Sequence, residues 1–271
     1  MITAASAPQT LPNHTTEPHT MIDRELDIST PDGAMNTFIT HPEEGGPHPA
    51  ILFYMDAPGK REELHDMARR LASAGYYVIL PNLYYRRSRD FKLTPGGGEA
   101  ERAVMFEHMH TITRAHILAD TRALLDFIDH DPAARPGTPS APAKVGVIGY
   151  CMSGPFVFWA TEANPQRIAA TASFYGVALC TDDANSPHRD AHLIQGEVYV
   201  GAAETDVYAP TEMITALDAH LKTTGIRYRV ETYPGTHHGF AFPKREGIYD
   251  KASAERHWER LHALFERNLK G

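Results

Sequence analysis

The residues with the clearest chemical potential lie at positions 145–154, which read Val-Gly-Val-Ile-Gly-Tyr-Cys-Met-Ser-Gly. An apolar run typical of a buried strand leads into a turn of small residues, and a helix is expected to follow. Gly149, Ser153 and Gly154 flank Cys151 where strand and helix approach closely in a nucleophile elbow. The beginning of a helix favours negative charge, and a thiolate is a strong nucleophile. The segment therefore predicts covalent catalysis by Cys151.

Two other interpretations of this segment are weaker. A free cysteine is usually a buried, inert thiol, but that role does not call for small residues around it. The segment also resembles the glycine-rich fingerprint of dinucleotide-binding proteins, yet Cys151 occupies the position where a glycine lets the pyrophosphate approach. Cys180 lies in a polar stretch without such a turn, and we assign it no role.

A nucleophilic thiol needs a general base and a carboxylate that orients the base, and in folds with a nucleophile elbow the acid precedes the histidine in the chain. Glu204 and Asp206 follow one predicted strand, and His237 and His238 follow the next. Because the carboxyl ends of parallel strands meet at one edge of a sheet, these groups are expected to converge on Cys151. Spacing alone does not separate Glu204 from Asp206, and either could instead cap the helix that follows.

The elements that would position these groups alternate between short apolar runs and amphipathic helical segments. This alternation is typical of a mostly parallel sheet covered by helices on both faces. Strands are expected at 24–30, 35–41, 50–56, 76–81, 144–149, 170–175, 196–202 and 228–233, the first two antiparallel. Helices are expected at 60–74, 155–162, 211–224 and 253–269, and one more follows the long polar stretch 84–101 and ends near residue 130.

The composition is that of a globular protein: of 271 residues, 42% are hydrophobic and 22% charged, and the formal net charge is −8. Residues 21–271 are therefore expected to form a single α/β domain. The negative charge disfavours binding to nucleic acid or to anionic membranes. No apolar run approaches the about 20 residues that a membrane-spanning helix needs.

Residues 1–20 are polar and lack the basic start and apolar centre of a secretory signal. We interpret them as a flexible extension. The absence of an export signal predicts a cytoplasmic location, in which Cys151 and Cys180 are free thiols.

Taken together, these features resemble the dienelactone hydrolase family over roughly residues 22–269. The family's elbow reads Gly-Tyr-Cys-x-x-Gly, as residues 149–154 do. The resemblance implies an α/β-hydrolase fold with a mostly parallel, roughly eight-stranded sheet. It also implies that an ester or lactone is hydrolysed through a thioester acyl-enzyme.

The resemblance further selects a triad of Cys151, Asp206 and His238. In the family the acid follows a Gly-containing strand end, which favours Asp206 over Glu204. The family's His-Gly-Phe motif favours His238 over His237.

Other positions match the family's substrate site. Residues 54–59 align with a segment that carries a glutamate in the family, so Asp56 is expected to contact the resting thiol until substrate displaces it. The resemblance also implies that the backbone N–H groups of Ala57 and Met152 form an oxyanion hole.

Residues 82–86, Asn-Leu-Tyr-Tyr-Arg, match the family's Asp-Leu-Tyr-x-Arg. Tyr84 is therefore a candidate substrate contact, and Arg86 is either an anchor for a substrate carboxylate or a solvated arginine. The family's second anchoring arginine would stand at position 242, which Phe242 occupies here.

We expect no cofactor, and no metal, because neither His108-x-His110 nor His237-His238 offers a complete ligand set at a familiar spacing. The expected partner is a small-molecule ester or lactone, without nucleic acid or membrane. Two alternatives stay open. The acyl group could pass to a nucleophile other than water in a transferase or ring-forming enzyme, or the fold could serve as a non-catalytic binding module. The oligomeric state is not predicted.

Overall fold

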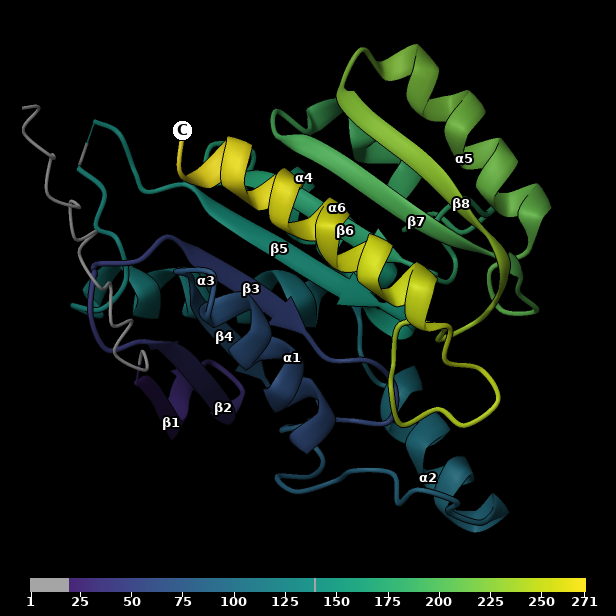
Figure 1. The fold of residues 1–271 in the computed structure, drawn as a ribbon, viewed down its shortest axis with the longest axis horizontal. Coiled ribbons are helices and arrows are strands. Elements are labelled where there is room, and N and C mark those ends of the chain that lie inside the picture. Colours follow the sequence, from purple (N-terminus) through teal and green to yellow (C-terminus); the bar gives the residue numbers. More distant parts are fainter. Residues whose placement is uncertain (1–19, 139) are drawn as a thin grey trace, which may run out of the picture.

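The computed structural model describes residues 20–138 and 140–271, so the predicted extension, apart from its last residue, lies outside the described residues. Eight strands form one sheet in the order β1-β2-β4-β3-β5-β6-β7-β8 (Figure 1). The strands are β1 (Met21–Thr30), β2 (Gly33–Pro42), β3 (Ala50–Tyr54), β4 (Tyr77–Pro81), β5 (Val145–Tyr150), β6 (Ile168–Phe174), β7 (Glu197–Thr205) and β8 (Arg227–His237). Strand β2 pairs antiparallel with β1 and β4, and the other pairings are parallel. The predicted α/β-hydrolase architecture is confirmed.

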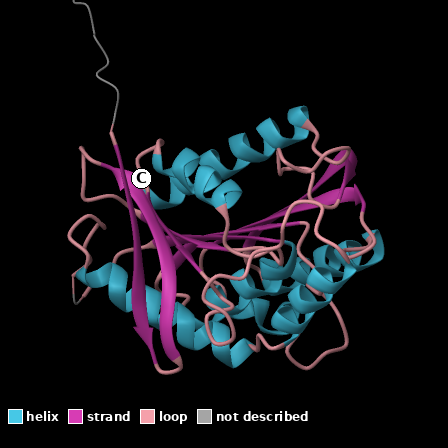
Figure 2. Ribbon diagram, turned by 90° about the horizontal axis from the view of Figure 1, so that it is seen from below, coloured by secondary structure: helices cyan, strands magenta, loops and turns pink. Residues whose placement is uncertain are grey.

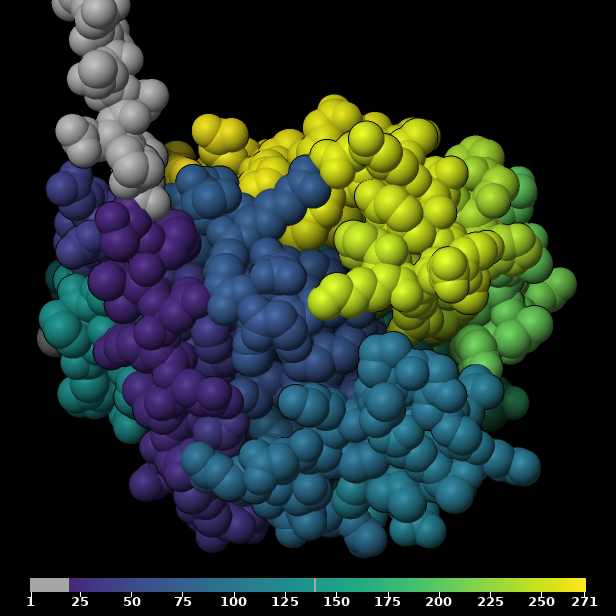
Figure 3. Space-filling model, turned by 60° about the horizontal axis from the view of Figure 1, so that its bottom comes forward, coloured from purple at the N-terminus to yellow at the C-terminus, as the bar shows by residue number. Residues whose placement is uncertain are grey.

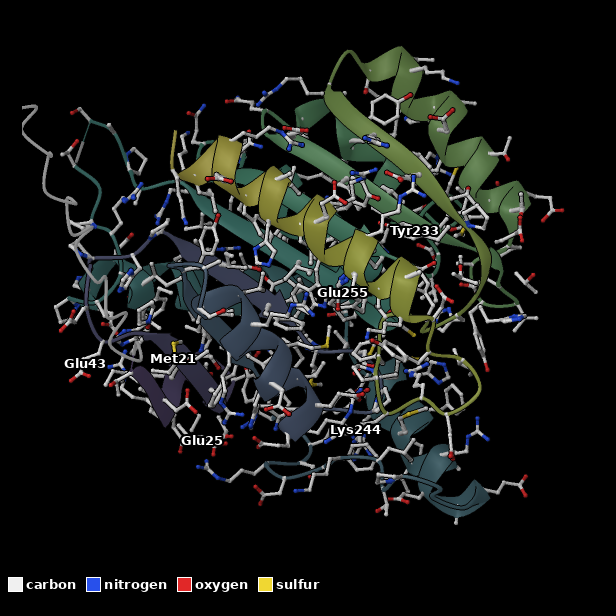
Figure 4. All side chains as sticks on the ribbon, in the orientation of Figure 1. Met21, Glu25, Glu43, Tyr233, Lys244 and Glu255 are labelled. Atoms are coloured by element: carbon white, nitrogen blue, oxygen red, sulfur yellow. The ribbon has the colours of Figure 1, made fainter. Side chains whose placement is uncertain are left out.

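Helices cover both faces of the sheet (Figure 2). On one face lie α1 (Glu62–Ala72) and α6 (Lys251–Leu269), which are joined by an ion pair between Arg70 and Glu255 (2.5 Å; Glu255 is labelled in Figure 4). The other face carries α3 (Arg114–His130), α4 (Gly154–Ala163) and α5 (Thr211–Thr224). Because both faces are covered, every residue of β3, β4 and β5 is buried, which explains why these strands are continuous apolar runs.

The segment before residue 130 differs from the prediction. Two helices replace the single one: α2 (Glu99–His110) ends, and α3 starts after Thr113, whose hydroxyl accepts a hydrogen bond from the backbone N–H of His116. This side-chain cap begins a new helix. A short 3₁₀ helix, η2 (Pro187–Leu193), was also missed, because three residues per turn leave no amphipathic period.

The parallel strands place their carboxyl ends along one edge of the sheet. The chain leaves β3 towards Asp56, β5 towards Cys151, β7 towards Asp206 and β8 towards His238. Figure 3, turned so that the bottom of Figure 1 comes forward, shows the segment after β8 (yellow-green) against α1 and the residues before it (blue). There the backbone N–H of Lys244 donates to Glu63 of α1 (2.9 Å; Lys244 is labelled in Figure 4).

Close backbone contact at the start of α4 gives the first prediction. A Cβ atom at Gly154 would lie 2.3 Å from the Cα atom of Gly176 and 2.9 Å from Ser173 Oγ. Gly154→Ala should therefore lower the free energy of unfolding by about 3 kcal/mol, as overpacking does, in urea denaturation. Gly98→Ala is the control, since Gly98 has a φ of −71° and no atom within 4 Å of the added carbon. Equal stability of the two variants would contradict the packing argument.

Candidate active site

Cys151 occupies a strained turn between β5 and α4, at the start of the 3₁₀ helix η1 (Cys151–Ser153). Its φ of +53° lies in the left-handed region that side chains other than glycine rarely adopt. Ser153 holds the turn: its Oγ accepts from the backbone N–H of Tyr150 (2.9 Å) and lies 3.2 Å from the carbonyl oxygen of Tyr54 in β3. A Cβ atom at Gly149 would lie 2.6 Å from the carbonyl oxygen of Ser153. The small residues around Cys151 are thus required by close contact.

Asp206 and His238 meet directly. Nδ1 of His238 donates to Oδ2 of Asp206 (2.7 Å), and their side chains are only 10% and 1% exposed. The structure does not bring the alternative residues together: Glu204 accepts instead from the backbone N–H of Gly235 (2.9 Å), and His237 is an exposed residue of β8. The pairing of acid and base therefore agrees with the choice that the family resemblance implied.

The His238 side chain also neighbours the Cys151 thiol. Nε2 is buried and has no hydrogen-bond partner among the described residues. Burial alone would lower the pKa of His238, but the hydrogen bond to Asp206 and the neighbouring Cys151 outweigh burial and raise this pKa to about 9. The imidazole is thus arranged to hold a proton between a carboxylate and a thiol.

Asp56 lies at the same edge of the sheet but is held by arginines. Its fully buried carboxylate accepts from both Nη atoms of Arg61 (2.5 and 3.2 Å) and from Nη2 of Arg245 (3.3 Å). The two guanidinium groups lie 5.3 and 5.1 Å from the ring centre of Phe242. No hydrogen bond joins Asp56 to Cys151 in the described part of the chain, and the carboxylate is instead held by the two guanidinium groups.

Arg61 and Arg245 were not predicted from the sequence, because the family resemblance places the second anchoring arginine at the position that Phe242 occupies. Arg245 reaches the site because residue 239 is glycine: a Cβ atom at Gly239 would lie 2.3 Å from Nη1 of Arg245. Gly239, directly after His238, indicated that another group packs closely against the backbone there, but the sequence did not show that this group is Arg245.

Tyr84 joins the two segments expected to form the oxyanion hole. Its hydroxyl donates to the carbonyl oxygen of Ala57 (2.8 Å) and lies 3.3 Å from Sδ of Met152. The backbone N–H of Ala57 makes no hydrogen bond with any residue that the structure describes. Tyr84 therefore fixes the loop that carries this N–H.

Arg86 is engaged elsewhere. Its guanidinium forms a two-pronged ion pair with Asp120 of α3 (2.9 and 2.7 Å) and a further contact with Asp32 in the β1–β2 turn (2.8 Å). The described contacts do not connect Arg86 to Cys151, Asp206 or His238. A substrate carboxylate at Arg86 would have to compete with two protein carboxylates.

Two tyrosines that were not predicted from the sequence pack against the imidazole of His238. The ring of Tyr175, directly after β6, lies 5.1 Å from the His238 ring, and that of Tyr208 lies 5.0 Å away, both edge to face. Tyr175 is fully buried with a φ of +37°, and its hydroxyl has no partner among the described residues. Placement after a parallel strand was the signal that could have identified Tyr175.

Within residues 20–138 and 140–271, no three His, Cys, Asp or Glu side chains are grouped so that they could hold a metal ion. His108 packs its ring against Phe91 (4.6 Å) and Tyr84 (5.3 Å). Over the same residues, no helix has the length and apolar character needed to cross a membrane.

Known proteins resemble this chain over most of its length. A sequence model of the dienelactone hydrolase family matches residues 35–269. A protein of Synechocystis sp. named "Putative carboxymethylenebutenolidase" is 27% identical over 238 residues, which cover 86% of this chain and 92% of that protein. A protein of the same name from Methylorubrum extorquens is 26% identical over 254 residues, covering 92% and 82%. The crystal structure titled "Putative Dienelactone Hydrolase" from Klebsiella pneumoniae shares the fold, with a TM-score of 0.76 at 24% identity over 91% of this chain and 98% of that one.

A second prediction follows from the hydrogen bond between Asp206 and His238. Asp206→Asn should lower the pKa of His238 from its value of about 9, because one of the two groups that oppose burial is lost and only Cys151 still raises this pKa. An NMR titration of the His238 ring protons measures this pKa. The control is Glu204→Gln, which removes a neighbouring carboxylate that does not contact His238. A pKa that stays near the wild-type value in Asp206→Asn would contradict the assignment.

The same pair should make stability depend on pH. A histidine whose pKa is raised on folding stabilises the protein fully below its unfolded pKa, near 6.5, and this contribution is lost as the pH rises through about 9. The excess stability of the wild type over Asp206→Asn, measured by urea denaturation, should therefore shrink between these two pH values. A constant difference would count against a protonated His238 in the folded protein.

Proposed function

The chain belongs to the dienelactone hydrolase family and is an ester or lactone hydrolase, and we propose that it acts through Cys151, His238 and Asp206 by way of a thioester acyl-enzyme. One observation carries the proposal: His238 is bound at Nδ1 by a buried carboxylate, its Nε2 has no partner among the described residues, and its ring neighbours a thiol held on a strained turn. A nucleophile, a base and a group that orients the base are the parts that covalent catalysis requires.

In the first step, the Cys151 proton passes to Nε2 of His238, and the sulfur attacks the carbonyl carbon of the substrate. A C–S bond forms as the carbonyl π electrons move onto oxygen. Asp206 accepts the hydrogen bond from Nδ1 and stabilises the imidazolium. The raised pKa of His238 supports this step, since it favours the protonated ring beside the sulfur.

The oxyanion is stabilised by the backbone N–H groups of Ala57 and Met152. Donors of this kind are often worth about 3 kcal/mol each in the transition state. The free N–H of Ala57 supports this role. The hydrogen bond from Tyr84 to the Ala57 carbonyl holds the next peptide group along the chain, and so restrains the loop that carries this N–H as charge develops.

When the intermediate collapses, the C–O bond to the alcohol portion breaks, and the leaving oxygen takes the proton from Nε2 of His238. The acyl group stays on Cys151 as a thioester. Water then gives a proton to Nε2 and attacks the thioester carbonyl, and collapse of the second intermediate releases the acid and returns the proton to sulfur. In each half of the reaction, His238 thus serves first as base and then as acid.

The proposed reaction requires a reduced nucleophile. Cys151 and Cys180 are both free in the structure. Free thiols suit the cytoplasmic location that the sequence predicts.

Replacement of the nucleophile is the test. Cys151→Ala should lower kcat/KM for phenyl acetate by about 10⁴-fold or more, because the covalent route is lost. Mass spectrometry of the quenched wild-type reaction should show an acetyl group on the peptide that contains Cys151. The matched control is Cys180→Ala, which should keep wild-type activity, since burial raises the pKa of the Cys180 thiol. Full activity of Cys151→Ala would overturn the proposal.

A further inference from the structure

Two large apolar side chains stand exposed directly after Asp206. Val207 is 84% exposed and Tyr208 is 54% exposed. Single exposed apolar residues are ordinary on protein surfaces, but these two are adjacent and one of them contacts the candidate base. The Tyr208 ring lies 5.0 Å from the His238 ring at an interplanar angle of 64°. We call Val207 and Tyr208 the apolar lip.

The backbone of the lip is fixed by the carboxylate that orients His238. Oδ1 of Asp206 accepts from the backbone N–H groups of Tyr208 and Ala209 (2.9 Å each), while Oδ2 accepts from His238 (2.7 Å). Ala209 is buried and anchors the far side of this turn. The lip therefore has a set position relative to the imidazole, as a preformed binding surface requires.

Three arginines considered for the site, Arg61, Arg245 and Arg86, are already paired with protein carboxylates. Asp56 is bound by Arg61 and Arg245, and Glu63 accepts from Arg61 (2.8 Å). The two positive charges of these arginines are thus balanced by the two negative charges of the carboxylates. Arg86, the remaining candidate anchor, is paired with Asp32 and Asp120. A substrate carboxylate would therefore have to displace a protein carboxylate.

We infer that the apolar lip selects the alcohol portion of the substrate, and that the substrate class is uncharged esters of aryl or long-chain alkyl alcohols. This inference rests on the proposed function. His238 gives its proton to the leaving oxygen, so the groups that contact the exposed side of His238 meet the part of the substrate attached to that oxygen. Val207 and Tyr208 offer that part apolar contact area, whereas a negative charge on it would meet Arg61, Arg245 and Arg86 already paired with protein carboxylates.

The test compares acetate esters that differ only in the alcohol. For the full-length protein, kcat/KM should be higher for phenyl and hexyl acetate than for methyl acetate. In the double variant Val207→Ser, Tyr208→Ser, this preference should fall about tenfold or more, mainly through KM, because apolar contacts are lost from bound substrate. Tyr208→Phe should keep the wild-type preference, since the inference uses the ring and not the hydroxyl.

Leu193→Ser is the matched control, because Leu193 is 45% exposed in η2, in the connection that leads to the amino end of β7. It should leave the preference unchanged. A double variant that slows all three acetates equally would overturn the lip's role in selection, because a purely structural role would affect every substrate alike.

Two further esters test whether the site disfavours a negatively charged substrate. 4-Carbamoylphenyl acetate should react at least about tenfold faster, in kcat/KM, than 4-carboxyphenyl acetate, which has the same shape and a negative charge. Faster turnover of the anionic ester would overturn the inference. Both tests are ratios between substrates of one active protein, so their outcome is separate from that of Cys151→Ala.

Discussion

The close approach of three backbone segments at the end of β5 is the constraint on which the site depends. Strand β5, helix α4 and the turn after β6 pack so tightly that Gly149, Gly154 and Gly176 have no room for a side chain. Only this packing allows Cys151 to keep a φ of +53°, which would otherwise relax. The carbonyl oxygen of Cys151 also accepts from the N–H of Val177 (3.1 Å), so the turn after β6 holds the nucleophile directly. The thiol is thus positioned by packing of the fold, not by a local motif alone.

A second level of organisation comes from Asp206, whose two oxygens serve different purposes. One orients His238, and the other fixes the backbone of Tyr208 and Ala209. The three hydrogen bonds that this buried carboxylate accepts hold both the imidazole and the backbone in place. Orientation of the base and placement of the apolar surface beside it are therefore linked through one side chain.

The sequence predicted the parts of the molecule that depend on local pattern. The strands were located to within a few residues, because buried parallel strands are continuous apolar runs. The elbow around Cys151 was visible because close packing demands small residues at fixed offsets. The break between α2 and α3 at Thr113 was not predicted, since a single capping residue within an otherwise helical composition gives a weak signal.

The ion pairs could not be predicted from the sequence, for a different reason. The partners of Asp56 are Arg61, in the following loop, and Arg245, which lies after β8. Neither pairing follows from spacing, because it depends on how the loop after His238 folds back over the sheet edge. The partner of Arg86 could not be predicted from spacing either, because Asp120 lies in α3, far from Arg86 in the sequence. Motif matching could thus propose charged residues for the site but could not show which charges were already neutralised.

The arrangement around Asp56 has a consequence for the thiol. A carboxylate that already accepts hydrogen bonds from two guanidinium groups has less capacity to accept from a further donor. With Asp56 engaged by Arg61 and Arg245, the proposed proton exchange with Cys151 falls to His238. The ion pairs of Asp56 that occupy Arg61 and Arg245 would therefore also leave the proposed nucleophile to His238, so the proposed substrate preference and thiol activation share this network.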